Sequence, residues 1–167
     1  VRGVLERAGG TGADVAGVAV CGHGKGLYAW GEDGHPVMNG ILSADNRAWE
    51  YPGRWHEDGT WERIRSRTCQ DIMACQPVAL LAWLKDHDRA AYDRILHVFS
   101  CKDYVRFRLT GEAWSEATDV SGSGLMNIRN ESFDVDILRA LGIEEVYEKL
   151  PPVCHSSDQC GAVTRAA

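Results

Sequence analysis

A glycine-rich segment at residues 22–26, with the sequence Gly-His-Gly-Lys-Gly, carries the residue types that first suggest chemistry. It follows a short apolar run at residues 15–20, so a phosphate-binding loop is the first hypothesis. The P-loop needs four residues between its first glycine and Gly-Lys-Ser/Thr, and this segment has neither that spacing nor the hydroxyl. The dinucleotide-binding fingerprint needs a helix directly after the loop, whereas this sequence predicts a hairpin there. The context therefore excludes both phosphate sites.

The same segment is suited to a small polar ligand. Its glycines let the backbone turn sharply, so that a ligand can approach it closely, as at Gly24. Lys25 offers three N–H donors to the hydroxyl or keto oxygens of a polyhydroxylated compound. The competing interpretation is that the glycines only shape a tight connection and leave His23 and Lys25 in solvent. We favour a binding loop, because loops carried on strands often hold functional residues.

Asp45 and Arg47 form a second candidate, directly after the third predicted strand. Asp is a favoured N-cap residue, so Asp45 on its own is better explained as the cap of the helix that follows. Arg47 on its own is better explained as a surface cation. These two residues become site candidates only through the resemblance described below.

The six cysteines include two pairs, Cys69 with Cys75 and Cys154 with Cys160, that share a five-residue gap. Structural zinc sites normally place two to four residues between paired ligands, so we expect no metal site. The cysteines are not dense enough for a disulfide scaffold, and no secretion signal precedes them. We therefore expect reduced thiols in a cytoplasmic protein. A zinc or redox protein built on the cysteines remains an alternative.

The charge and hydrophobicity of the chain indicate which classes of binding partner are not expected. The net charge is −6, and no Lys/Arg-rich run could neutralise neighbouring phosphates, so nucleic acid is not expected as a partner. The apolar stretch at residues 78–84 is far shorter than the roughly 20 residues that cross a bilayer, and no membrane association is expected. The chain begins with Val1 and ends in a helix-forming run at residues 164–167. We expect it to be an internal fragment of a longer protein.

Sequence patterns predict the elements that position the candidate residues. Strands are expected at residues 15–20, 27–30, 37–42 and 97–99. An Asp-Gly turn joins the second and third of these strands as a hairpin. Helices are expected at residues 1–7, 46–57, 61–67, 76–88, 89–96, 102–109, 135–141 and 144–150, and a loop with extended pieces at residues 115–126. Within the last helix, Glu145 and Lys149 should pair one turn apart.

Four stretches in this order resemble the first domain of the FGGY carbohydrate kinases: residues 18–28, 41–48, 101–112 and 118–124. The resemblance covers nearly the whole chain. The Gly-His-Gly-Lys-Gly segment is most similar to the L-xylulose kinase branch, which also acts on 3-keto-L-gulonate. Residues 1–167 then resemble a partial N-terminal sugar-kinase domain. The resemblance implies an α/β domain of the actin-like, ribonuclease H-like ATPase fold, incomplete because its first strands and its second domain are missing.

The resemblance also implies roles for individual residues. Lys25, His23, Gly24, Asp45 and Arg47 correspond to positions at or near the sugar, and the loop at 118–124 to another wall of the pocket. The Asp-x-Gly-Thr turn that handles ATP phosphates is missing, and the catalytic aspartate is expected beyond the C-terminal end. No catalytic residue and no metal ligand is therefore assigned within this chain.

From the resemblance we expect the whole protein to phosphorylate a sugar at the expense of ATP, with Mg²⁺ as the second cofactor. The substrate would be a ketopentose such as L-xylulose or a related keto sugar, and the fragment alone would be inactive. The alternative is a noncatalytic sugar-binding or regulatory module of the same fold. The expected partner is the small-molecule sugar, and a homodimer is left open.

Overall fold

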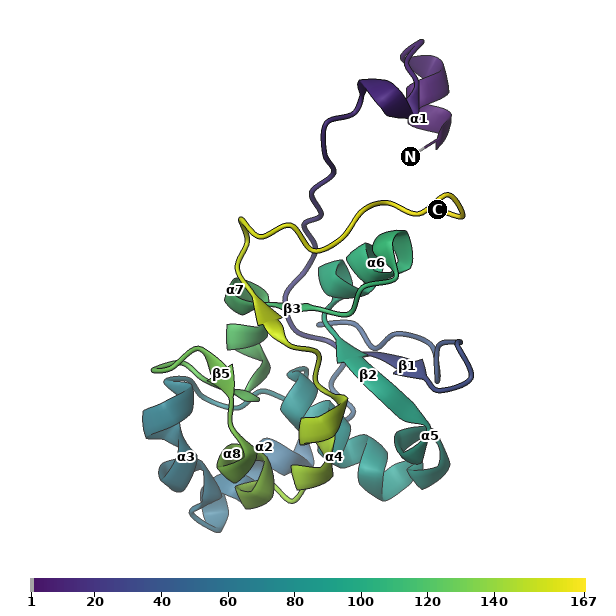
Figure 1. Ribbon diagram of the computed structural model, residues 1–167. Coiled ribbons are helices and arrows are strands. Elements are labelled where there is room, and N and C mark those ends of the chain that lie inside the picture. Colours follow the sequence, from purple (N-terminus) through teal and green to yellow (C-terminus); the bar gives the residue numbers. More distant parts are fainter. Residues whose placement is uncertain (1) are drawn as a thin grey trace.

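The computed structural model describes residues 2–167 (Figure 1). Its helices are α1 Arg2–Arg7, α2 Glu50–Glu57, α3 Thr60–Thr68, α4 Pro77–His87, α5 Arg89–Asp93, α6 Cys101–Thr110, α7 Ala117–Val120 and α8 Val135–Ala140, with 3-10 turns η1 Gly12–Asp14, η2 Ser121–Ser123 and η3 Glu144–Lys149. Its strands are β1 Tyr28–Gly31, β2 Ile95–Phe99, β3 Ser115–Glu116, β4 Met126–Asn127, β5 Ser132–Phe133 and β6 Val153–Cys154. Within residues 2–167, none of these helices has the length and apolar character needed to span a membrane.

The predicted hairpin forms only in part, because residues 37–42 form no regular strand and this segment meets the first strand through isolated bridges alone. β1 pairs antiparallel with β2 on one side, and on the other it meets residues 36–41 through isolated bridges, including Leu27 to Ile41. The turn is closed where the Gly34 N–H donates to the Gly31 carbonyl at 3.1 Å. Ile95 belongs to β2, although it lies within the helix predicted at residues 89–96. Its β-branched side chain is buried in the core, and its backbone pairs with β1. The helical part of that prediction ends at Asp93.

The core forms around α4, which matches the helix predicted at residues 76–88. Pro77 occupies its first turn, where the missing N–H has no intrahelical partner to lose. Leu80 and Leu81 are fully buried, and Ile137 and Leu138 of α8 join them in the same cluster. Figure 1 shows α2, α3, α5 and α8 in the same half of the molecule as α4. Burial of these side chains supplies the main stabilisation of this half.

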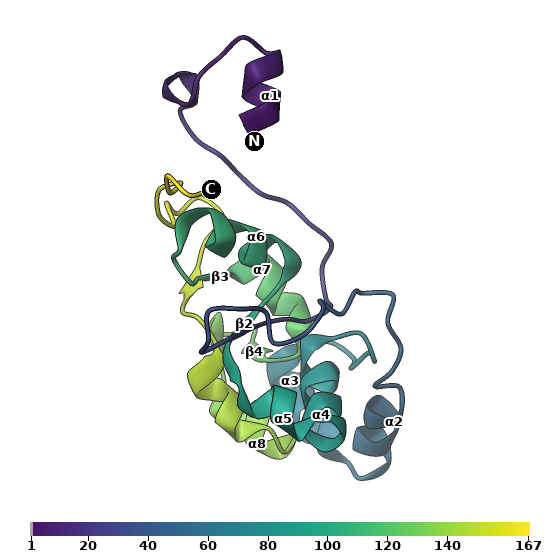
Figure 2. The ribbon, with the colours of Figure 1, turned by 90° about the vertical axis from the view of Figure 1, so that its right-hand side faces the viewer.

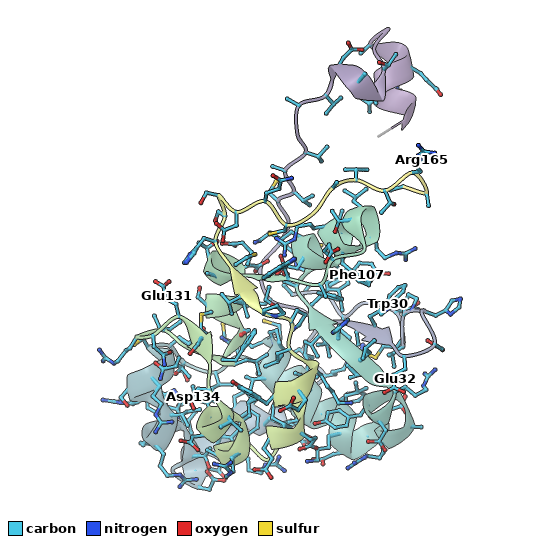
Figure 3. All side chains as sticks on the ribbon, in the orientation of Figure 1. Trp30, Glu32, Phe107, Glu131, Asp134 and Arg165 are labelled. Atoms are coloured by element: carbon cyan, nitrogen blue, oxygen red, sulfur yellow. The ribbon has the colours of Figure 1, made fainter. Side chains whose placement is uncertain are left out.

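α6 covers one part of the β1–β2 sheet through aromatic side chains. The rings of Trp30 on β1 and Phe107 on α6 lie 5.2 Å apart edge to face, and Figure 3 shows the two side by side. Phe107 also stacks on Phe99 at 4.9 Å, and Tyr104 stacks on Tyr28 at 5.8 Å. These contacts fix α6 against the strand that follows the glycine-rich segment. The Gly111 cap at the end of α6 has a φ of 78°, as the sequence predicts.

The strand predicted at residues 15–20 is wrong. The segment is extended but joins no sheet, and Val15 and Val18 are 37% and 47% exposed. It runs from the body of the molecule toward α1, which lies apart from the other helices (Figures 1 and 2). A β-strand needs the backbone of a neighbouring strand, and no strand among residues 2–167 pairs with this segment. The helix predicted at residues 1–7 is confirmed as α1, and Val1 lies outside the described residues.

Two local predictions are also corrected. Residues 115–126 form short regular elements in place of a loop, because Glu116 caps α7 by accepting the N–H groups of Thr118 and Asp119. The predicted pair of Glu145 and Lys149 is absent from the described ion pairs. In its place Glu145 pairs with Lys85 at 2.5 Å, and Lys149 donates to the Ile95 carbonyl at 2.7 Å. The segment is a 3-10 turn of three residues per turn, in which side chains four apart do not align.

Candidate functional site

The glycine-rich segment at residues 22–26 connects the extended N-terminal stretch to β1 along a tight path. A Cβ at Gly26 would lie 2.4 Å from the Ile41 carbonyl oxygen, and the φ of Gly26 is +77°. Only glycine tolerates both conditions. The Gly26 N–H donates to the Cys75 carbonyl at 2.9 Å, which ties the segment to the residues just before α4. The segment is therefore held in one conformation.

Lys25 has a left-handed backbone with a φ of 66°. That conformation costs a residue with a Cβ roughly 1–2 kcal/mol, and such outliers cluster at functional sites. Its Nζ donates to the Met73 thioether sulfur at 2.9 Å, and thioether sulfur is a weak acceptor. Lys25 therefore holds a charged donor next to a weak partner, where a ligand oxygen would be a better acceptor.

His23 faces the interior. Its Nδ1 lies 3.2 Å from the Gly24 carbonyl, which can only accept, so Nδ1 carries the proton and Nε2 accepts from the Tyr28 hydroxyl at 2.9 Å. Burial, followed by the hydrogen bond and charge of Cys101, raises the pKa of Tyr28 to about 12, so the phenol stays a donor at neutral pH. These contacts give His23 a clear part in fixing the loop.

Gly24 lies beside Asp119, a residue of the loop at 118–124 that the resemblance assigns to a wall of the sugar pocket. A Cβ at Gly24 would come 3.7 Å from Asp119 Oδ1. Asp119 and Lys25 both line a small cavity of about 20 Å³, enough for one water molecule or one ligand group. The Asp119 side chain is 6% exposed, and its Oδ2 has no hydrogen-bond partner among residues 2–167. Burial raises the pKa of Asp119. The sequence carries no signal of that burial.

Gln76 joins the two walls of this cavity. This residue is 1% exposed, and its amide nitrogen donates to Gln70 Oε1 at 2.7 Å and to the Gly122 carbonyl at 2.9 Å. Its amide oxygen accepts the Met73 N–H at 2.8 Å. Gln70 donates in turn to the Ser121 carbonyl at 2.6 Å. The segment that contacts Lys25 and the segment that follows Asp119 are therefore fixed to one buried side chain.

A buried charge cluster lies behind Asp119. Asp103 is 1% exposed, accepts from the Ser100 hydroxyl and the Glu116 N–H at 3.0 Å each, and pairs with Arg106 at 3.0 Å. Lys102 donates to Glu116 and lies 3.9 Å from Asp119 Oδ2. Two cations therefore offset three carboxylates. The unpartnered oxygen of Asp119 is the part of the cluster that a ligand hydroxyl could satisfy.

Glu116 makes the stability of this cluster sensitive to acid. Burial alone raises the pKa of Glu116, but hydrogen bonds from Lys102, Thr118 and Ser156 outweigh it and lower the pKa from 4.5 to about 2. The stabilisation is therefore fully present above pH 4.5 and is lost as the pH falls toward 2. From this group we expect the free energy of unfolding to fall by about 3 kcal/mol over that range in urea titrations. Glu116→Gln should remove that part of the slope, and an unchanged slope would contradict the assignment.

Asp45 and Arg47 contact each other. Arg47 donates from Nε to Asp45 Oδ1 at 2.9 Å and from a terminal nitrogen to Oδ2 at 2.8 Å, and its guanidinium lies 5.1 Å from the centre of the Trp83 ring. The hydrogen bond from Arg47 lowers the pKa of Asp45. α2 begins at Glu50, so Asp45 does not cap it. The structure thus brings His23, Gly24 and Lys25 together, while Asp45 and Arg47 form a separate, partly exposed pair.

Residues 2–167 do not form a recognisable site for Mg²⁺. Within residues 2–167, no three His, Cys, Asp or Glu side chains gather as a metal site would require. Glu116 and Asp103 are already paired with Lys102 and Arg106, whereas magnesium usually takes carboxylate and phosphate oxygens. No step of a reaction is therefore assigned to this ion in this chain.

Comparison with known proteins shows which family and which relatives this chain is similar to. Residues 1–167 match the N-terminal domain of the FGGY family of carbohydrate kinases. The L-xylulose/3-keto-L-gulonate kinase of Escherichia coli (strain K12) is 37% identical over 164 residues, covering 98% of this chain and 33% of that protein. A probable L-xylulose kinase of Pasteurella multocida (strain Pm70) is 35% identical over 167 residues, covering 100% and 35%. The chain therefore spans about a third of the length of these curated relatives.

A solved structure confirms the predicted fold class. The crystal structure of xylulose kinase from Rhodospirillum rubrum superimposes with a TM-score of 0.84 at 21% identity, covering 99% of this chain and 35% of that one. At that identity the likeness concerns the fold alone. It agrees with the α/β, actin-like ATPase class expected from the sequence.

Proposed function

The chain belongs to the FGGY family of carbohydrate kinases, and on that basis we propose that the whole protein transfers a phosphoryl group from ATP to a hydroxyl of a sugar. We infer a ketopentose such as L-xylulose, or a related keto sugar, as substrate, because relatives with 35–37% identity carry those names. Residues 1–167 contribute part of the sugar site as a partial N-terminal domain.

The observation that carries this proposal is the placement of Lys25. A glycine would hold its left-handed backbone at lower cost, yet the position carries an ammonium whose described partner is a thioether. Beside it, Asp119 presents a buried acceptor without a hydrogen bond. A donor and an acceptor at one cavity suit a polyhydroxylated ligand, because each sugar hydroxyl both donates and accepts. Sites of this kind discriminate strongly against analogues that lack the hydroxyl.

The other candidate residues take different parts in this proposal. Gly24 has no side chain beside Asp119, where a Cβ would come 3.7 Å from Oδ1, so that the ligand can approach the backbone. His23 holds the loop through its hydrogen bond to Tyr28. Asp45 and Arg47, which bind each other, would form an outer part of the pocket in the whole protein.

ATP is the cofactor in this proposal, and Mg²⁺ would accompany it. Phosphoryl transfer depends on positioning the sugar hydroxyl and on neutralising charge at the phosphoryl oxygens. The described residues would serve the first task by binding and orienting the sugar. We also propose a cytoplasmic location, where ATP is available and the cysteines stay reduced. A homodimer remains a hypothesis.

The test is ATP consumption by the whole protein with a panel of pentuloses, hexulosonates and polyols. We expect turnover on a keto sugar, because the relatives with 35–37% identity are named for L-xylulose and 3-keto-L-gulonate, and much less on polyols without the keto group. ATP-dependent product should appear as a sugar phosphate by mass spectrometry. If a folded protein binds ATP and a sugar but forms no phosphate ester, the kinase proposal is rejected in favour of a noncatalytic regulatory module.

A further inference from the structure

The paired thiols at the end of the described fold are in contact. Cys154 on β6 and Cys160 are 5% and 8% exposed, and their sulfur atoms lie 3.4 Å apart. The loop between them is held in place, because the His155 N–H donates to Asp158 at 2.8 Å and the Ser156 hydroxyl donates to Glu116 at 2.8 Å. The two sulfurs are therefore kept together by the fold.

We propose that Cys154 and Cys160 are a site of reversible intramolecular disulfide formation. A disulfide bond is about 2.05 Å long, so the sulfurs need to approach by only about 1.4 Å. The other pair with the same spacing is arranged differently. The Cys69 thiol is exposed and points to the Ser66 carbonyl at 3.8 Å, whereas Cys75 is buried. Spacing is the same in both pairs, so the structure alone distinguishes them.

The oxidant in this proposal is hydrogen peroxide, and Cys160 is the thiol of the pair that lines a groove. Cys160 lines a groove of about 720 Å³ that runs between residues 15–21 and α6. The Cys160 sulfur attacks the peroxide, so that an S–O bond forms, the O–O bond breaks and water leaves. The Cys154 sulfur then attacks the Cys160 sulfur, so that the S–S bond forms, the S–O bond breaks and a second water leaves. Overall, two thiols and one hydrogen peroxide give one disulfide and two waters.

The order of attack follows from burial. Burial, together with the hydrogen bond that Cys154 shares with Cys160, raises the pKa of Cys154 to about 11, so little of it is thiolate at neutral pH. Cys160 borders the groove and meets the oxidant first. Zinc is a poorer occupant, since two thiols supply only half of the usual four ligands. No third His, Cys, Asp or Glu completes a metal group anywhere in residues 2–167.

The experiment uses the native protein, with hydrogen peroxide as probe, followed by thiol alkylation, tryptic digestion and mass spectrometry. Trypsin places both cysteines of the proposed site in the peptide of residues 150–165. It places Cys69 and Cys75 together in the peptide of residues 68–85, which is an internal control of equal spacing. Cleavage before Asp158 separates Cys154 from Cys160 and shows whether the halves stay linked.

We expect the peptide of residues 150–165 to lose two hydrogen atoms and to take up no alkyl group, and dithiothreitol to restore both thiols. The peptide of residues 68–85 should keep two alkylated thiols under the same conditions. In Cys154→Ser the first peptide should show an oxidised or capped Cys160 without the loss of two hydrogens. Full alkylation of Cys154 and Cys160 after peroxide would overturn the proposal, as would equal crosslinking of both peptides.

Discussion

Under the proposed function, replacing Lys25 with glycine in the whole protein is expected to lower kcat/KM for the sugar by about 10- to 100-fold, because a hydrogen bond from a charged donor is worth roughly 1.5–3 kcal/mol. The same change should leave thermal stability unchanged or slightly higher. Glycine relieves the left-handed strain at a φ of 66°, and this gain is partly offset by the greater freedom of the unfolded chain. Activity and stability therefore move in opposite directions, which a merely structural residue would not do.

Glu131 provides the matched control for this experiment. It is a non-glycine residue with a φ of 52°, exposed on the turn between β4 and β5, where Figure 3 shows it at the edge of the molecule. Glu131→Gly relieves the same kind of strain and should leave kcat/KM unchanged. Steady-state kinetics with varied sugar and with varied ATP separate the two substrates. If Lys25→Gly keeps full activity on every sugar, the assignment of Lys25 to the sugar site is wrong.

Asp103→Ala is expected to lower the free energy of unfolding by about 3–5 kcal/mol, the usual result of removing one partner from a buried charge pair. The substitution leaves Arg106 without its carboxylate and the Glu116 N–H without its acceptor. Urea unfolding measures the loss. Asp136→Ala is the matched control, because Asp136 pairs with Arg139 on the surface, where both side chains are more than half exposed. That change should cost less than about 1 kcal/mol.

If the Asp103 and Asp136 variants lose similar stability, the cluster beside α6 does not stabilise the fold as described. A loss confined to Asp103→Ala would show that the cluster stabilises the fold, and sugar affinity tests whether the cluster also supports Asp119. Sugar affinity should then fall together with stability in that variant, whereas Asp136→Ala should change neither.

Local signals explain which elements were predictable. The hairpin turn followed from Asp-Gly between two apolar runs, α4 from Pro77 and leucines three residues apart, and the end of α6 from Gly111. Each of these signals acts within a few residues of the element that it sets. The apolar run at residues 15–20 carried an equally strong strand pattern, but pairing depends on a neighbour that is remote in sequence. Periodicity alone does not reveal whether that neighbour is present.

The geometry of the candidate site was predictable in part, because some of its signals are local. The glycines around Lys25 indicate an unusual backbone conformation, and the structure shows positive φ angles at Lys25 and at Gly26. The burial of Asp119 depends on residues that are remote in sequence, among them Lys102 of α6 and Gly24, so no local pattern marks it. Asp45 and Arg47 are two residues apart, and their opposite charges permit the ion pair that the structure shows.

The side-chain amide of Gln76 influences the relative positions of Lys25 and Asp119. Because one core side chain holds both the segment that contacts Lys25 and the segment that follows Asp119, a shift in its packing moves donor and acceptor relative to each other. Under the proposed function, such a shift alters which spacing of sugar hydroxyls fits the cavity best. Substrate preference can then change through a buried amide, while Lys25 and Asp119 stay the same.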